Sequence, residues 1–256
     1  MSPNPILRAL SSIRKSGAKT LLMGGQACVF YGAAEFSRDL DLLLLADETN
    51  LDRLRGALAG LAAEPIAIPS LAAANLNRGL AVHFRCRRED VAGLRIDVMS
   101  VLRALASFED LWARRTTIEV DGDEIDLLSL EDLVRSKKTQ LDKDWPMIRR
   151  LVEQSYFGSP ADSERIHFWL RELRTAELLI KVAGDHAAAS RVVAEARVAV
   201  RAAQGGDLEQ VELALAQEEL DERRRDRAYW EPLKRELEGL RRTRRQSAGP
   251  DQNPLV

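Results

Sequence analysis

The spacing of apolar residues changes near residue 128, and this change divides the chain into two predicted domains. Before it, short apolar runs alternate with amphipathic stretches, which is typical of mixed strand and helix structure. After it, apolar residues recur at helical spacing to about residue 243. We therefore predict an α/β (α+β) core with a small mixed sheet over 1–128, an all-helical domain over 129–245, and a disordered tail over 246–256.

Local patterns predict the order of elements within the first domain. An amphipathic helix is expected near the N-terminus, and the stretch 63–78, rich in Ala, Pro and Asn, is expected to be a loop. Further helices are predicted at 26–34, from about 50 to 62, and at 104–114. Strands are predicted at 20–23, 40–45, 80–86 and 94–99, with a hairpin at 116–128 around Asp121-Gly122.

Composition excludes several classes of protein. The 256 residues carry a formal net charge of −2, so overall charge gives no reason to expect a nucleic-acid or membrane partner. Cys28 and Cys86 lie too far apart in sequence for a metal motif or a disulfide framework, and we expect two buried thiols. There is no signal-peptide pattern, and no apolar run approaches the roughly 20 residues of a membrane span. We expect a soluble cytoplasmic protein without a membrane partner.

Two aspartates at the start of a predicted strand are the first candidates for chemistry. Asp39 and Asp41 are two residues apart, so a strand places both carboxylates on one face. Carboxylates about 6–7 Å apart along a strand repel each other unless a cation lies between them. Mg²⁺, or Mn²⁺ in its place, is the natural cation, since it prefers carboxylate and phosphate oxygens. Taken alone, the pair also fits a solvated strand edge.

A third aspartate and a pair of glycines make the pattern more specific. Asp97 lies within a later strand, where it shares a face with Arg95 and completes a possible two-metal site. Gly24-Gly25 ends one predicted strand and opens a helix, where glycine lets the backbone approach a phosphate closely. Ser37-Arg38 directly precedes the aspartate pair.

This combination resembles the signature of the DNA polymerase β nucleotidyltransferase superfamily: a hydrophobic residue, Gly-Gly, a helix of about ten residues, then Asp-x-Asp. Within that superfamily the chain most resembles the bacterial AbiEii-like minimal nucleotidyltransferases, and the helix opening at 128–144 adds to the resemblance. The resemblance covers roughly residues 18–155. The chain departs from it at Glu35 and Leu141, where relatives often have Arg.

The resemblance implies roles for individual residues. It implies that Asp39 and Asp41 bind Mg²⁺ and that Asp97 binds metal or acts as the base. It implies that the nucleotide, ATP or another NTP, is bound by Gly24, Gly25, Ser37, Arg38, Lys137, Lys138 and Lys143. Without the resemblance, the adjacent lysines would be read as a solvated helix face.

Three functions remain open. The first is Mg²⁺-dependent transfer of a nucleoside monophosphate from an NTP to a hydroxyl of a tRNA, a protein or a small molecule. The AbiEii-like resemblance adds a role as the toxin of a toxin–antitoxin system, with a cognate antitoxin or regulatory protein as partner. The alternative is a weak or inactive protein of the same fold that binds nucleotide or a partner. The third is RNA binding through the basic runs 223–225 and 241–245, which also fit a salt-bridged exposed helix.

Other conspicuous residues have simpler interpretations. We expect the three histidines, His83, His167 and His186, to be ordinary surface or core residues rather than a zinc site. Arg171 and Arg174 are expected on one helix face, either meeting acceptor phosphates or pairing with nearby acidic residues.

Overall fold

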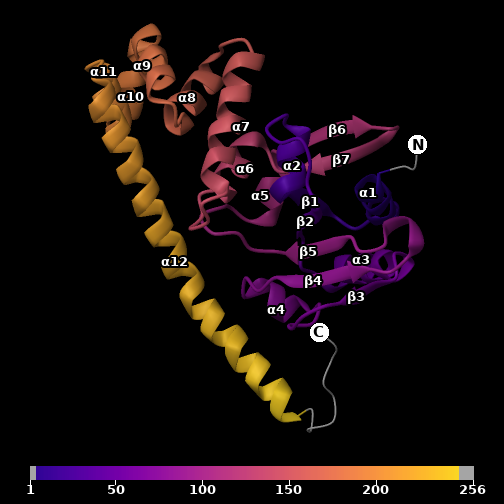
Figure 1. Ribbon diagram of the computed structural model, residues 1–256. Helices are drawn as coiled ribbons and strands as arrows, with labels where there is room; N and C mark the ends of the chain where they lie inside the picture. Colours follow the sequence, from indigo (N-terminus) through magenta and orange to yellow (C-terminus); the bar gives the residue numbers. More distant parts are fainter. Residues whose placement is uncertain (1–3, 248–256) are drawn as a thin grey trace. The chain divides into compact units, whose positions relative to one another are not determined.

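The computed structural model describes residues 4–247, which form two compact units (Figure 1). The sheet unit consists of residues 4–26, 36–129 and 228–247. The helical unit consists of residues 27–35 and 130–227.

Seven strands of the described residues form one mixed sheet within the sheet unit. Their order is β3-β4-β5-β2-β1-β7-β6. The pairs β2/β5 and β1/β7 are parallel, and the other neighbours are antiparallel. The strands are β1 (Thr20–Met23), β2 (Asp39–Leu44), β3 (Ala63–Pro65), β4 (Val82–Cys86), β5 (Arg95–Met99), β6 (Thr116–Val120) and β7 (Asp123–Leu127). The predicted small mixed sheet is confirmed.

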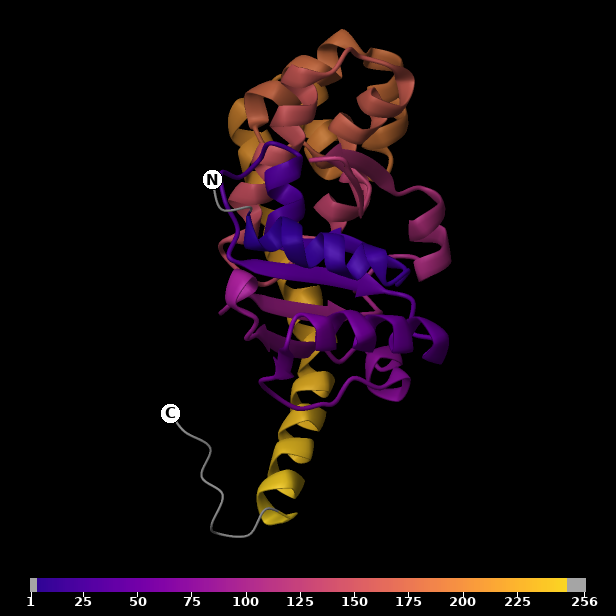
Figure 2. The same ribbon diagram turned by 90° about the vertical axis from the view of Figure 1, so that its right-hand side faces the viewer.

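Two capped helices pack side by side in the sheet unit (Figure 2). Helix α1 (Pro5–Lys15) begins after Asn4, whose side chain accepts a hydrogen bond from the Ile6 N–H at 3.0 Å. Helix α3 (Glu48–Gly60) begins after Asp47, whose side chain accepts from the Asn50 N–H at 2.8 Å. Such caps satisfy backbone donors that the first helical turn leaves unpaired.

The expected loop at 63–78 is wrong, because it contains strand β3 and helix α4 (Ala73–Asn77). Strand β3 exists through its pairing with β4, where Ala63 is opposite Cys86 and Pro65 is opposite Phe84. Local composition did not reveal these long-range backbone hydrogen bonds. The short elements η1 (Glu89–Val91) and α5 (Phe108–Ala113) complete the unit before β6.

Helix α2 (Gly24–Phe30) starts earlier and ends earlier than the predicted 26–34. It follows β1 without a loop, because the chain turns at Gly24 itself, at φ +68°. The helix gives way to a turn in which Gly32 adopts φ +75°. The predicted hairpin is confirmed: Asp121 at +52° and Gly122 at +81° form the left-handed turn that joins β6 and β7.

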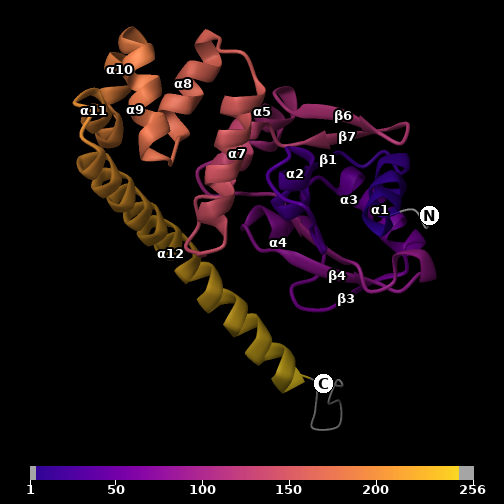
Figure 3. The same ribbon diagram turned by 45° about the horizontal axis from the view of Figure 1, so that its top comes forward.

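The short helices α8 to α11 of the helical unit pack against one another (Figure 3). Aromatic and aliphatic side chains are buried among the helices of this unit. Trp145 and Trp169 are among the buried residues. The helices after residue 129 are α6 (Leu130–Ser136), α7 (Asp144–Gly158), α8 (Ser163–Glu172), α9 (Ala176–Asp185), α10 (Ala187–Ala194), α11 (Val198–Gln204) and α12 (Leu208–Ser247). From Ala228 onward, α12 belongs to the sheet unit.

Helix ends correct two further predictions. Helix α8 ends at Glu172, so Arg174 lies beyond it and does not share a helix face with Arg171. Helix α12 continues to Ser247, past the predicted start of the disordered tail. The remainder of that predicted tail, 248–256, lies outside the described residues. Cys28 and Cys86 are buried free thiols, as predicted.

None of the helices within residues 4–247 has the length and apolarity needed to cross a membrane.

Candidate functional site

Strand register brings the three predicted aspartates to one face of the sheet. Asp41 on β2 is directly opposite Asp97 on the parallel strand β5, and Asp39 is opposite Arg95. Residues in register on neighbouring strands point to the same side, and residues two apart along a strand do too. We call this set, Asp39, Asp41, Asp97 and Arg95, the carboxylate face. The alternating leucines Leu40 and Leu42 are fully buried on the other side.

Asp97 is largely enclosed and bonded to two basic side chains. Its Oδ1 lies 2.8 Å from Arg95 Nε and 2.8 Å from His83 Nδ1. Its side chain is 17% exposed. Burial raises the pKa of Asp97, but the hydrogen bonds from His83 and Arg95 outweigh it and leave that pKa below its usual value. Asp97 is therefore an ionised carboxylate at neutral pH.

Arg95 is the cation that contacts Asp97. Its hydrogen bond to Asp97 is the largest influence and raises the arginine pKa against the opposing effect of burial. The charges of Asp97, Asp39 and Asp41 each add to this increase. One guanidinium therefore interacts electrostatically with all three aspartates.

Close contacts explain the two glycines that open α2. A Cβ on Gly24 would collide with the Asp41 carboxylate, and its φ of +68° is one that other residues rarely adopt. A Cβ on Gly25 would lie 2.8 Å from Ser37 Oγ. The Ser37 hydroxyl in turn donates to the backbone carbonyl of Asp39 at 3.1 Å, which fixes the start of β2. The glycines thus let the turn after β1 lie directly against the carboxylate face.

The donor chemistry of this face fits a divalent cation. Three carboxylates from adjacent strands are the hard oxygen ligands that Mg²⁺ and Mn²⁺ prefer. The three side chains share a face but do not converge on one point: residues 4–247 contain no group of three or more His, Cys, Asp or Glu side chains arranged to hold a metal. Asp97 is bonded instead to Arg95 and His83.

The predicted phosphate-contacting lysines belong to the helical unit, where two of them form ion pairs. Lys137 Nζ lies 3.0 Å from Asp144 Oδ1, and Lys138 Nζ lies 2.6 Å from Glu172 Oε2. Lys143 is exposed at the start of α7. In the sheet unit, Arg38 is exposed beside Ser37. Nucleotide contacts by these residues remain predictions.

The basic run at the centre of α12 forms ion pairs. Arg223 pairs with Asp142 and Glu219. Arg224 and Arg225 pair with acidic residues three positions before each of them. This is the pattern of a salt-bridged exposed helix rather than of a dedicated nucleic-acid surface. Of the later run 241–245, the side chains of residues 244 and 245 lie outside the described ones.

His83 is the functional neighbour that sequence reasoning missed. It was expected to be an ordinary histidine, yet β4 pairs with β5 so that His83 is directly opposite Asp97. The sequence pattern predicted that the strands at 80–86 and 94–99 pair with each other. It did not predict which residues of the two strands are opposite each other. The sequence did predict that Arg95 shares a face with Asp97, because the two residues are two apart on one strand. It did not predict the hydrogen bond between them.

Comparison with known proteins gives distant structural likenesses only. No family model and no curated protein matches the chain. An antigenic nucleotidyltransferase-like protein from Paracoccidioides brasiliensis is 18% identical, with 73% of this chain and 92% of that chain covered and a TM-score of 0.41. JHP933 from Helicobacter pylori is 14% identical, with 92% and 96% covered and a TM-score of 0.38. At these scores the likenesses carry no argument about function, and the proposal below depends on the carboxylate face.

Proposed function

We propose that the carboxylate face is the active site of a nucleotidyltransferase, which moves a nucleoside monophosphate from an NTP to an acceptor hydroxyl. The observation that carries the proposal is the register of β2 and β5. It places Asp41 opposite Asp97, with Asp39 two residues away on the same face and Gly24 against Asp41. Structural carboxylates are seldom grouped in this way, because their mutual repulsion costs stability.

The site residues have distinct tasks in this proposal. Asp39, Asp41 and Asp97 would hold Mg²⁺, which supplies positive charge to the phosphoryl oxygens. The turn at Gly24-Gly25 would receive the triphosphate, because no side chain stands between its backbone and Asp41.

In the proposed reaction, one bond to the α-phosphorus forms as another breaks. The acceptor oxygen forms a bond to the α-phosphorus, and the bond from that phosphorus to the bridging oxygen breaks. Pyrophosphate leaves with the electron pair, and the acceptor proton passes to the Asp97 carboxylate. Asp97 is assigned this role because it lies in register with Asp41 on the neighbouring strand. The acceptor, a tRNA, a protein or a small molecule, stays open, as does a toxin role with a cognate antitoxin.

The test is label transfer from each of four α-labelled NTPs, with Mg²⁺ and a fractionated cell lysate supplying acceptors. The wild-type protein is compared with D41N and with D52N. Asp52 is a matched control, because it is an exposed aspartate of the same unit that pairs with Arg55 on α3. Transfer by the wild type and D52N but not by D41N supports the proposal.

A binding measurement separates the alternative. If Mg²⁺ with a non-hydrolysable NTP raises the melting temperature but no fraction becomes labelled, the protein is a nucleotide-binding module of the same fold. If neither stabilisation nor labelling occurs, the proposed site is wrong.

A further inference from the structure

The Asp97 carboxylate already has a cationic partner, and that partner comes from its own strand. Arg95 Nε and His83 Nδ1 both reach the same oxygen, Oδ1, at 2.8 Å. Arg95 Nη2 also lies 3.2 Å from His83 Nδ1. Because arginine is always a donor, His83 Nδ1 either accepts from Arg95 or donates to Asp97. In both cases the guanidinium remains bonded to Asp97.

We infer that Arg95 is a built-in counter-cation that competes with a divalent metal ion for Asp97 and so sets the metal affinity of the carboxylate face. The inference rests on the proposed function, since it concerns the same metal site. The residue therefore acts through Asp97, as a positioning residue, rather than on the reacting atoms.

Charge on this face explains why such a residue is useful. Arg85, opposite Arg95 on β4, adds a second guanidinium to this side of the sheet. Three carboxylates and two guanidiniums still leave an excess of negative charge, so a divalent cation is still attracted. The Arg95 guanidinium reduces the mutual repulsion of the carboxylates, because it interacts with Asp39 and Asp41 as well as Asp97. The face is thereby stabilised without a metal, at the expense of weaker metal binding.

Geometry makes the exchange feasible. Arg95 is 38% exposed, so its side chain has room to leave Asp97, whereas the carboxylate is 17% exposed and held by the sheet. A hydrogen bond to a charged group contributes about 1.5–3 kcal/mol, which corresponds to roughly tenfold or more in affinity. The competition is therefore large enough to measure.

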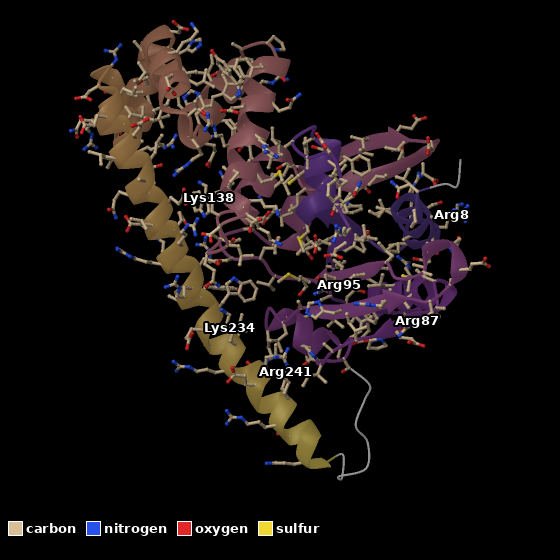
Figure 4. All side chains as sticks on the ribbon, in the orientation of Figure 1. Arg8, Arg87, Arg95, Lys138, Lys234 and Arg241 are labelled. Carbon is tan, nitrogen blue, oxygen red and sulfur yellow. The ribbon has the colours of Figure 1, made fainter. Side chains whose placement is uncertain are left out.

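The experiment is titration of Mn²⁺ alone, without nucleotide, followed by electron paramagnetic resonance of the free ion. R95Q is compared with wild type and with R87Q. Arg87 is a matched control that directly follows β4, and it forms an exposed ion pair with Glu64 at 2.9 Å instead of contacting Asp97 (Figure 4). We expect R95Q to bind Mn²⁺ about tenfold more tightly than wild type, and R87Q to bind as wild type does.

A second variant and a second readout keep the test decisive. R95K retains one positive charge but lacks the guanidinium fork, so we expect it to bind Mn²⁺ with an affinity between those of wild type and R95Q. It also allows the comparison to be made if R95Q fails to fold. The melting temperature of R95Q in EDTA should fall below that of wild type, and Mn²⁺ should restore it. If Arg95 had only a structural role, the melting temperature of R95Q would fall and Mn²⁺ would not restore it.

The Mn²⁺ titrations distinguish failure of this inference from failure of the proposed function. Equal or weaker Mn²⁺ binding by both Arg95 variants overturns the inference and leaves the proposed metal site standing. Absence of Mn²⁺ binding in wild type and in both variants overturns the two together.

Discussion

Charged side chains are arranged differently in the two units. In the helical unit, Arg174 and Arg197 are 11% and 10% exposed and share the carboxylate of Glu218 at 2.9 and 3.0 Å. Lys137 and Lys138 pair with the nearly buried Asp144 and Glu172. In the sheet unit, by contrast, three aspartates share one side of the sheet with two arginines, Arg95 and Arg85.

The difference separates charges that are paired within the fold from charges that fit the proposed site. Buried cations of the helical unit each have a carboxylate partner, and two of them also bond backbone carbonyls: Arg174 bonds Leu215 O, and Arg197 bonds Leu170 O and Leu173 O. Such groups satisfy the rule that buried charges are paired and hydrogen-bonded. The carboxylate face leaves a surplus of one sign on a half-exposed surface, which favours a ligand of the opposite sign.

Loss of Asp41 should have the largest effect. We expect D41A to reduce transfer by at least about 10²–10³-fold, the loss typical when one charge-stabilising group is removed. Folding should be retained, and stability in EDTA should equal or exceed that of wild type, because one repelling carboxylate is gone. Initial rates of label transfer and urea unfolding in EDTA measure the two effects. An unfolded D41A protein would mean that this aspartate is structural and would remove the contrast between the units.

Loss of Glu218 should be the opposite case. E218Q leaves two buried guanidiniums without their carboxylate, and breaking a buried pair typically costs about 3–5 kcal/mol. Because Glu218 is 25% exposed, we expect the lower end of that range. Urea unfolding of E218Q with and without Mg²⁺ checks this, and the loss should be the same in both conditions. A loss that Mg²⁺ restores would contradict a structural role.

Two glycine variants test the contact between the turn at Gly24 and the carboxylate face. G24A places a Cβ against the Asp41 carboxylate in a left-handed conformation, whereas G93A, at φ +82°, meets nothing within 4 Å. Backbone strain alone costs roughly 1–2 kcal/mol in either variant. We expect G24A to lose more free energy of unfolding than G93A. In a D41A background the difference between the two losses should shrink but not vanish, because alanine at position 41 keeps the Cβ that lies 2.7 Å from the new one. An unchanged difference would show that the Asp41 carboxylate is not the obstacle.

Sequence patterns predicted the elements better than their partners. Asp39 and Asp41 could be assigned to one face because alternation along a strand is local, and Gly24 could be assigned to a tight turn for the same reason. The opposition of Asp41 to Asp97 and of His83 to Asp97 depends on strand register, which is fixed by pairing across the sheet. Strand β3 was missed for the same reason. Likewise, the partners of Arg174 lie more than 40 positions away in α12, beyond any local signal.

The smallest expected effect concerns an exposed pair on the sheet unit. Hydrogen bonds from Arg88 and then from Arg8 lower the pKa of Asp90 to about 2. A lowered folded-state pKa contributes stability that is present above the unfolded value, near 3.9, and is lost as the pH falls through the folded value. Between pH 4 and 2 the free energy of unfolding of the wild-type protein should therefore fall more steeply than that of D90N, which lacks this carboxylate. The difference between the two proteins should disappear near pH 2. Urea unfolding across this range, at low salt, measures the difference. Parallel stability curves for the two proteins would mean that this pair contributes nothing, as is common for exposed ion pairs and unlike the buried pairs of the helical unit.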